Sequence, residues 1–319
     1  MRALCFGELL IDMVSPQPDA DLGAATQFLK APGGAPANVA VGMARLGIAS
    51  GFVGSVGDDP FGHFLREVVG RENVDVSGVK LSKNSTTIAF VATKTDGSKD
   101  IWFGRNPGAD ADFSVHDLPD LRDVTIFHCG SVSLSLDPCR SAQFEAARRV
   151  RAHGGLVSFD PNWRPSLWND FEQAHRLIWQ MMELSDIVKV ADEEWEFVTG
   201  TPDFAAGAAK IRESGPRLVL QTRGKDGAVF DFDGGRGEIA GLKVQALDTL
   251  GAGDAFVAGF LAEVARAGSL EAILNVEELN AALRFANACG ALATQKAGAI
   301  PSLPSHGEIA AFLQTGLNS

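Results

Sequence analysis

Residues 248–256 read Asp-Thr-Leu-Gly-Ala-Gly-Asp-Ala-Phe and stand directly ahead of the strongest amphipathic segment in the chain. In that segment Phe256, Phe260 and Val264 recur every four residues, which is the spacing of one face of a helix. The pattern predicts a helix over 254–267 that begins at the end of a loop of small residues.

The small residues of this loop favour a binding site for an anion. Gly251, Ala252 and Gly253 let backbone N–H groups approach a ligand closely, and the N-terminus of a helix adds partial positive charge. Asp254 is either a first-turn carboxylate that only satisfies free N–H groups or a base beside the anion hole. The second interpretation explains the small residues, because such a carboxylate can deprotonate a hydroxyl that attacks phosphorus.

A second stretch, Gly33 to Ala40, reads Gly-Gly-Ala-Pro-Ala-Asn-Val-Ala and predicts a loop that runs into a helix with Pro36 near its first turn. It is either an ordinary loop or part of a site, because Asn38 in an otherwise apolar first turn needs a polar partner such as a substrate hydroxyl. Asp12, at the end of the first predicted strand, is a further candidate. Ligands of open α/β sheets bind beyond the carboxyl ends of the strands, where an Asp can accept hydrogen bonds from two sugar hydroxyls.

Around these stretches, short apolar runs alternate with segments of helix length. The predicted strands are Ala3–Leu10, Gly51–Val56, Val124–Cys129, Leu156–Phe159, Ile187–Val190 and Leu218–Gln221. The predicted helices are Ala37–Leu46, Phe61–Val69, Ser141–His153, Phe171–Leu184, Asp254–Ala267 and Val276–Thr294. This alternation predicts a parallel sheet covered by helices on both faces, and no linker or repeat divides the chain.

Two segments interrupt the alternation. Thr86–Val91 and Asp100–Phe103 flank Asp96-Gly97, a dipeptide typical of hairpin turns. Together with residues near Met13 to Ala31, this hairpin is expected to form a small sheet apart from the main one.

Composition excludes several classes of function. The chain has 319 residues, of which 45% are hydrophobic and 21% charged, and its net charge of -12 does not suit binding to nucleic acid. The four cysteines have no metal-ligand spacing and are expected to be reduced. No apolar run approaches the ~20 residues of a membrane span, and the N-terminus shows no leader pattern, so we expect a cytoplasmic protein.

Other motifs are less specific. Thr222 to Gly227 reads Thr-Arg-Gly-Lys-Asp-Gly after a predicted strand, and its glycines either make room for a nucleotide or form a plain hairpin turn. Gly235 to Ala240 matches the dinucleotide fingerprint by letters, but no helix is predicted after it. The sequence has no GxxxxGK[ST], GxSxG or HExxH, and its scattered histidines do not favour histidine-centred catalysis.

With both glycine-containing signatures in this order, the chain resembles the ribokinase/PfkB sugar kinases from end to end. The resemblance implies an α/β fold, namely the three-layer α/β/α ribokinase-like fold with a mostly parallel central sheet and a small β-sheet lid. It implies a single kinase domain over 1–319, with the lid formed by about 13–31 and 86–106. It further implies ATP-dependent phosphorylation of a sugar hydroxyl, use of Mg²⁺ and K⁺, and Asp254 as the base.

The same resemblance implies the residues of each part of the site. The expected sugar ligands are Asp12, Gly33, Gly34, Asn38, Arg105 and Arg164, and the expected nucleotide contacts are Thr222, Gly224, Gly227 and Asn287. Glu194 resembles the acidic end of the family's Asn-x-x-Glu motif, which organises Mg²⁺ and phosphate, but Ala191 occupies the Asn position and offers no such contact. Mainly backbone carbonyls would hold K⁺, at Asp248, Leu250, Ala293, Lys296, Gly298 and Ser302.

Within the family, the chain is most similar to bacterial fructokinases. The resemblance rests on Gly7 to Asp12, Ala31 to Ala40, Arg105-Asn106-Pro107 and Asp160-Pro161-Asn162-Trp163-Arg164. We therefore expect conversion of D-fructose to fructose 6-phosphate. 2-Keto-3-deoxygluconate kinases share several of these features, and Arg105 and Arg164 could contact either a neutral sugar or a carboxylate.

A catalytically inactive fructokinase-like binding protein is an alternative from a different class. Retention of Asp254, the anion hole and Glu194 argues against it. The expected partners are a small-molecule sugar and ATP, without nucleic acid or membrane. A homodimer is a further alternative that the sequence leaves open.

Overall fold

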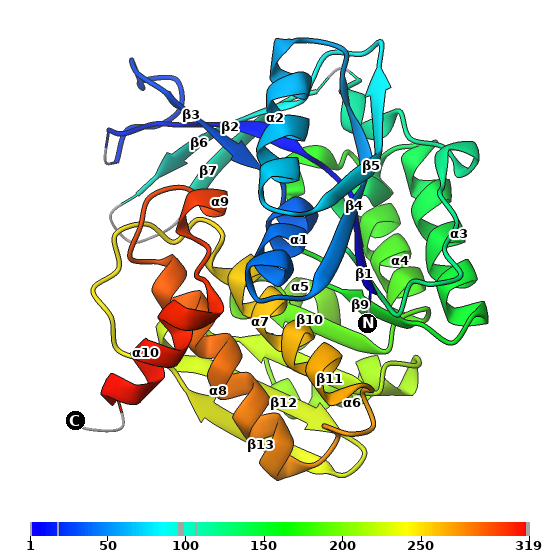
Figure 1. Ribbon diagram of the computed structural model, residues 1–319, viewed down its shortest axis with the longest axis vertical. Coiled ribbons are helices and arrows are strands. Elements are labelled where there is room, and N and C mark those ends of the chain that lie inside the picture. Colours follow the sequence, from blue (N-terminus) through cyan, green and yellow to red (C-terminus); the bar gives the residue numbers. More distant parts are fainter. Residues whose placement is uncertain (1, 18, 95–98, 106, 317–319) are drawn as a thin grey trace.

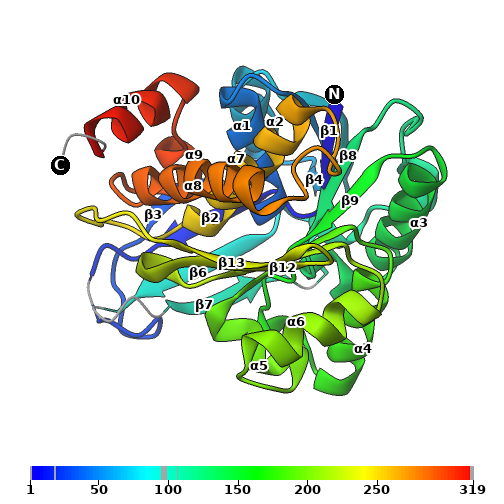
Figure 2. The ribbon, with the colours of Figure 1, turned by 90° about the horizontal axis from the view of Figure 1, so that it is seen from below.

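The main sheet has nine strands and lies between two layers of helices (Figures 1 and 2). The computed structural model describes residues 2–17, 19–94, 99–105 and 107–316. The sheet order is β13-β12-β11-β10-β9-β8-β1-β4-β5, with parallel pairing from β5 to β11 and antiparallel pairing of β11, β12 and β13. The strands are β1 (Arg2–Phe6), β4 (Ala49–Gly57), β5 (Asp75–Ser82), β8 (Ile126–Cys129), β9 (Leu156–Phe159), β10 (Ile187–Ala191), β11 (Leu218–Thr222), β12 (Gly227–Phe232) and β13 (Gly235–Ala240).

The two helical layers bury both faces of this sheet, as Figure 2 shows. One layer contains α1 (Ala35–Arg45), α2 (Pro60–Arg71), α7 (Ala252–Ala267), α8 (Val276–Ala293), α9 (Ala299–Ser302) and α10 (His306–Gly316). The other contains α3 (Cys139–Ala152), α4 (Phe171–Met182), α5 (Asp192–Thr199) and α6 (Phe204–Glu213). In β1, Ala3 and Cys5 belong to one hydrophobic core, whereas Leu4 and Phe6 belong to the other. The continuous apolar character of the strand follows from this burial on both faces.

A separate sheet of four strands adjoins the main one, in the order β3-β2-β6-β7. Its strands are β2 (Leu10–Val14), β3 (Leu29–Gly33), β6 (Ile88–Thr93) and β7 (Lys99–Gly104). β6 and β7 pair antiparallel, as expected for the predicted hairpin, although the predicted turn Asp96-Gly97 lies outside the described residues. The ribokinase-like α/β architecture with a small accessory sheet is therefore confirmed.

The prediction of one strand over Ala3–Leu10 is wrong, because the chain leaves the main sheet after Phe6. Gly7 packs so closely against α1 that a Cβ atom on it would lie 2.6 Å from Cγ of Pro36. β2 then begins at Leu10 in the small sheet. Asp12 consequently lies inside β2 and not beyond the end of a main-sheet strand, which corrects its expected position.

Within the described part of the chain, no helix combines the length and the apolar character that crossing a bilayer requires.

Candidate active site

The two glycine-containing signatures meet in the structure. Helices α1 and α7 pack side by side (Figure 1), and their approach is close enough that a Cβ atom on Gly42 would lie 2.6 Å from Cβ of Ala258. At this contact the Asn38 Nδ2 donates a hydrogen bond of 2.7 Å to Oδ2 of Asp254, across 216 residues of sequence. Asn38 Oδ1 is buried and has no hydrogen-bond partner among the described residues.

Asp254 occupies the first turn of α7, where backbone N–H groups have no acceptor one turn earlier. Gly251 caps the helix with φ of 79°, a left-handed conformation that favours glycine, and a Cβ atom there would lie 3.0 Å from Cα of Ala299. Gly251, Ala252 and Gly253 thus bring the positive end of the α7 dipole to a site beside the Asp254 carboxylate.

The electrostatics of Asp254 result from opposing neighbours. Burial raises the pKa of Asp254, and the Asp160 carboxylate adds to this effect. The Asn38 hydrogen bond and the cations Lys189 and Arg164 act in the opposite direction. The net effect is a raised pKa, so the carboxyl holds its proton more firmly than a solvent-exposed Asp does.

Glu194 lies in the first turn of α5, beside this cluster. Its Oε1 accepts a hydrogen bond of 2.7 Å from the Trp163 N–H, whereas its buried Oε2 has no hydrogen-bond partner in the described ranges. Burial, together with Asp160, raises the pKa of Glu194 to about 7, while Lys189 and Arg164 oppose the shift. An unpaired carboxylate oxygen here suits an interaction with Mg²⁺ or with its bound water. Over the residues that the structure describes, no group of three or more His, Cys, Asp or Glu side chains could hold a metal ion by itself.

The glycines expected at the sugar site are required by close packing. A Cβ atom on Gly33 would lie 1.9 Å from Oδ2 of the buried Asp12, and one on Gly34 would lie 2.3 Å from the carbonyl oxygen of Glu8. Gly34 also has φ of 113°. Asp12, Gly33 and Gly34 therefore lie together at the junction between the small sheet and α1.

The two candidate arginines have different surroundings. Arg105 is buried, its Nη2 lies 2.8 Å from Oδ2 of Asp110, and its Nη1 donates to Oγ of Ser135 at 2.7 Å. Arg164 is about one-third exposed, and its Nη1 lies 3.8 Å from Oε1 of Glu194. Arg164 is thus the arginine with a guanidinium that reaches the Asp254 cluster.

The expected nucleotide residues lie around the β11–β12 turn and α8. Thr222 ends β11, and Gly224 and Gly227 have φ values of 52° and 101° in the turn that follows. A Cβ atom on Gly227 would lie 2.0 Å from the carbonyl oxygen of Ile239, so packing against β13 already requires this glycine. Asn287 of α8 donates from Nδ2 to the carbonyl oxygen of Ala240 at 3.2 Å. The Thr222–Gly227 stretch thus forms a hairpin turn, and packing explains Gly227. Whether its glycines also make room for a nucleotide stays open.

The two segments expected to hold K⁺ are joined by Asp248. One carboxylate oxygen accepts from the Leu250 N–H at 2.9 Å, and the other accepts from the Gly298 N–H at 2.8 Å. Ala293 ends α8, Lys296 pairs with Glu308, and the Ser302 hydroxyl donates to the carbonyl oxygen of Ala299. Because the Asp248 side chain is engaged with N–H groups, backbone carbonyls are the donors left for a cation, and they suit a hard monovalent ion.

Sequence analysis gave no role in the site to three buried charged residues that lie near it, namely Glu8, Asp160 and Lys189. Lys189 stands in the otherwise apolar run Ile-Val-Lys-Val-Ala of β10, and a lysine in such a strand is the signal that could have identified it. Its Nζ donates to Oδ2 of Asp160 at 3.0 Å. Asp160 follows β9 directly and Lys189 lies in the middle of the neighbouring strand β10, so two adjacent strands supply this ion pair.

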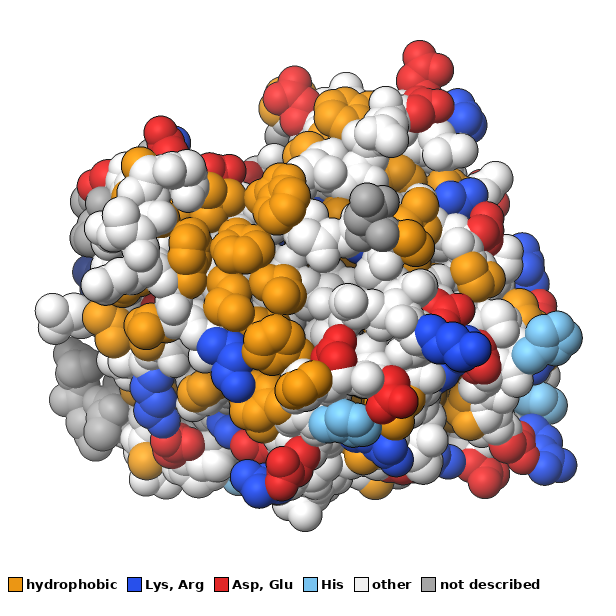
Figure 3. Space-filling model, turned by 90° about the horizontal axis from the view of Figure 1, so that it is seen from above, with side chains coloured by type: hydrophobic (Ala, Val, Ile, Leu, Met, Phe, Trp, Pro, Cys, Tyr) orange, Lys and Arg blue, Asp and Glu red, His pale blue; other side chains and the backbone are white. Residues whose placement is uncertain are grey.

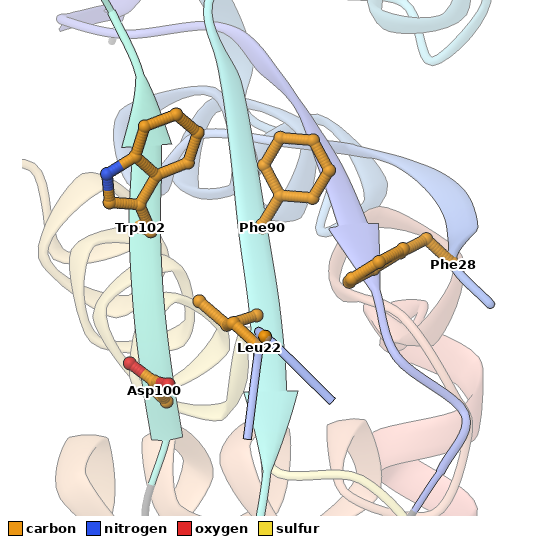
Figure 4. Close-up of a pocket in the computed structure, with 6 residues that line it drawn as sticks. Leu22, Phe28, Phe90, Asp100 and Trp102 are labelled. Atoms are coloured by element: carbon orange, nitrogen blue, oxygen red, sulfur yellow. The ribbon is translucent and has the colours of Figure 1, made fainter. Parts of the chain in front are cut away.

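The small sheet carries an open hollow on the face that points away from Asp12. It has a volume of about 510 Å³ and is lined by Leu22, Gly23, Phe28, Phe90, Asp100 and Trp102 (Figure 4). Asp12 pairs with Ala89, whereas the next residue, Met13, pairs with Phe90, and neighbouring strand residues point to opposite faces. The hollow is therefore separate from the cluster around Asp254.

Comparisons with known proteins agree with this geometry. The profile of the pfkB family carbohydrate kinases matches residues 2–306. Probable fructokinase-2 of Arabidopsis thaliana is 41% identical over 314 residues, which cover 97% of this chain and 94% of that protein.

Two solved structures are similar over almost the whole chain. Fructokinase from Xylella fastidiosa with bound ATP has a TM-score of 0.90 and 36% identity, covering 99% of this chain and 98% of that one. A double mutant of fructokinase from Vibrio cholerae O395, in a form with bound fructose, ADP and potassium ion, has a TM-score of 0.88 and 34% identity, covering 98% of each chain.

Proposed function

The chain belongs to the pfkB family of carbohydrate kinases, and on this premise we propose that it transfers the γ-phosphoryl group of ATP to D-fructose, giving fructose 6-phosphate. Fructokinases at about 40% identity over nearly the whole chain, and a similar structure that contains fructose and ADP, support this choice of substrate.

The hydrogen bond from Asn38 to Asp254 is the observation that carries the proposed mechanism. It fixes one carboxylate oxygen, so that Oδ1 can take the proton from a sugar hydroxyl. As that proton moves to Asp254, the hydroxyl oxygen forms a bond to the γ-phosphorus, and the bond to the bridging oxygen of ADP breaks. Charge on the transferred phosphoryl group would face the N–H groups of Gly251 to Gly253.

The sugar would lie between the Asn38 and Asp12 side chains. The unpartnered Asn38 Oδ1 can accept a hydrogen bond from a hydroxyl, and Asp12 supplies acceptors for neighbouring hydroxyls. A sugar acid needs a cation for its carboxylate, but the Arg105 charge is already paired with Asp110. We therefore propose that Arg105 supports the wall of the site and that, of these two candidate arginines, the partly exposed Arg164 is the one whose guanidinium faces substrate.

The nucleotide and metal ions would occupy the opposite end of the site. Thr222, Gly224, Gly227 and Asn287 are proposed to border the nucleotide. Mg²⁺, when bound, would supply positive charge to the phosphate oxygens, and Glu194 Oε2 is the group proposed to orient it. K⁺ is proposed between the two segments that Asp248 joins, where it would order the loop before α7.

A panel of sugars and sugar acids tests the substrate. ADP release should give a higher kcat/KM for fructose than for 2-keto-3-deoxygluconate, by up to roughly 10⁴-fold, because unpaired polar groups reject the wrong ligand. A higher value for 2-keto-3-deoxygluconate would remove the fructose assignment and keep the sugar kinase. If none of the sugars in the panel caused ADP release, an inactive binding protein would be favoured instead.

A further inference from the structure

Lys189 is a buried cation beneath the loop that precedes Asp254. Its side chain is 8% exposed, and its Nζ donates to Oδ2 of Asp160 at 3.0 Å. A Cβ atom on Gly253 would lie 3.5 Å from the same Nζ, so the ammonium group lies directly against the proposed anion hole. The proposed mechanism gives this lysine no role.

The charged groups that act on Asp254 come from two neighbouring segments. Asp160 and Arg164 belong to the loop after β9 and Lys189 to β10, while the neutral Asn38 amide faces Asp254 from α1. The same Asp160, Lys189 and Arg164 act on Glu194 of α5. Three carboxylates thus share two cations. Arg164 is the more exposed of these cations and lies 3.8 Å from Glu194, so Lys189 is the more buried cation and is fixed by its bond to Asp160.

The geometry points to Lys189 as a positioning residue that acts through Asp254, keeping the Asp254 carboxyl ionised and ready to accept the substrate proton at neutral pH. This inference rests on the proposed role of Asp254 as base. The bond to Asp160 matters as well, because it holds the ammonium near Asp254 without a direct salt bridge, which would occupy the oxygen that must take the proton. Burial opposes the ionised form of Asp254, and a nearby opposite charge within a low-dielectric site favours it.

The alternative is that Lys189 is only the structural partner of Asp160, joining two neighbouring strands. The two roles predict different results, because loss of a structural pair lowers stability or rate without moving a titration. Loss of a charge that acts on Asp254 moves the pH at which the enzyme gains activity.

Lys189→Met removes the charge at similar length, and Lys189→Arg restores it. We would measure kcat/KM for fructose with saturating ATP and Mg²⁺ from about pH 5.5 to about pH 9. The acid limb of Lys189→Met should move to higher pH by about one unit or more, with activity recovering at high pH. Lys189→Arg should return the limb towards that of the parent. Arg212→Met is the matched control, because it removes a cation from the buried Asp231 in another part of the molecule and should leave the profile unmoved.

A uniform loss of rate in Lys189→Met across the whole pH range would overturn the inference. If that variant does not fold, Asp160→Asn provides the second arm. It removes a like charge near Asp254 and releases the Lys189 ammonium, so its acid limb should move to lower pH; an upward shift would contradict the inference.

A readout without activity separates this inference from the proposed function. In ligand-free protein labelled with ¹³C at the Asp carboxyls, the Asp254 resonance is identified by its loss in Asp254→Asn. Its titration should move to higher pH in Lys189→Met. If the Asp254 titration does not move, the inference is rejected even if the parent phosphorylates fructose. If the titration moves but the protein phosphorylates no sugar, the electrostatic coupling stands and the proposed function is rejected.

Discussion

At the scale of single residues, Glu8 is a buried carboxyl that binds the start of α1. Glu8 is 4% exposed, and its Oε1 accepts a hydrogen bond of 3.0 Å from the Ala35 N–H. Burial raises the pKa of Glu8 to about 7, although backbone hydrogen bonds oppose the shift. The folded protein therefore retains this proton at pH values where the unfolded chain has released it.

Glu8→Gln should gain stability relative to the parent as the pH rises. A carboxyl with a raised pKa contributes stability that is present below its unfolded pKa and is lost as the pH rises through its folded pKa, here between 4.5 and about 7. Gln keeps an acceptor for the Ala35 N–H and has no charge to bury. In urea unfolding, the variant should lead the parent by about 1–3 kcal/mol near pH 8 and by much less near pH 5. Glu67→Gln, at an exposed position of α2, is the control. A difference that is constant with pH would contradict the prediction.

The single residues also show where sequence reasoning ends. Asp254, Asn38 and the glycines at 251 and 253 could be identified because their types break an otherwise apolar or regular pattern. Lys189 breaks its pattern equally, but its importance depends on the Asp160 side chain from a neighbouring strand. Sequence spacing carries no information about which strands become neighbours, so such a pair needs the structure.

At the scale of elements, Asp59 joins α2 to the small sheet. As the N-cap of α2 it accepts hydrogen bonds from the N–H groups of Phe61 and Gly62 at 3.0 and 2.9 Å, and it also accepts one of 2.7 Å from the Thr86 N–H. Burial would raise the pKa of Asp59, but these hydrogen bonds outweigh it and the pKa is lowered. One carboxylate thus satisfies the start of a helix and the approach to β6.

Asp59→Ala should lower the free energy of unfolding at neutral pH by about 1–2 kcal/mol. Because the folded pKa is lowered, this contribution is present above the unfolded pKa of 3.8 and is lost as the pH falls through the folded value. The difference between parent and variant in urea unfolding should therefore shrink in acid. Asp58→Ala is a matched control, since its exposed side chain pairs with the exposed His63. Equal losses in the two variants would show that the cap has no special role.

The small sheet is predicted to act as a lid over the sugar. Gly33 and Gly34 lie where β3 passes into α1, and the β7 carbonyl of Ile101 accepts a hydrogen bond of 3.3 Å from the Ser166 hydroxyl of the main body. Hydrogen exchange in β6, β7 and the segment around Phe28 should slow when fructose binds, because closure shields the sheet from water. Exchange in α4, on the other helical layer, is the internal control. Unchanged exchange in the small sheet at saturating fructose would reject a moving lid.

The elements predicted best have a clear apolar pattern. The predicted strand Leu156–Phe159 has the same bounds as the apolar strand β9, and the predicted helices at 171–184 and 276–294 lie within two residues of the amphipathic helices α4 and α8. β5 and β13 were missed, because they lie at the sheet edges and alternate less exposed with more exposed residues, so neither forms an apolar run. The break between β1 and β2 was missed because Gly7 interrupts an apolar run only through its contact with Pro36, which lies 29 residues later.

At the scale of the whole molecule, hydrophobic side chains gather on the face shown in Figure 3. Trp102 of the small sheet is 57% exposed, and the ring centroids of Phe28 and Phe90 lie 5.2 Å apart in the hollow of Figure 4. Exposed apolar area of this kind is typical of an interaction surface.

We expect the apolar surface around the hollow of Figure 4, which includes Phe28, Phe90 and Trp102, to join two copies of the chain. Analytical ultracentrifugation of the parent should give the mass of a dimer at micromolar concentration, and Trp102→Ser should shift the equilibrium towards the monomer. Phe171→Ser, which changes an exposed aromatic residue on α4, serves as the control. A parent that sediments as a monomer at about 50 μM would contradict the expected dimer.

The central claim is that Asp254, held by Asn38 at the start of α7, is the base of a sugar kinase. The most direct measurement is the turnover number for fructose and ATP of purified Asp254→Asn beside the parent, with single-turnover kinetics to show that chemistry limits the rate. The variant keeps the size of the side chain and removes the proton acceptor, so kcat should fall by ~10²–10⁴-fold while the fold and ATP binding persist. A turnover number within about threefold of the parent would contradict the account.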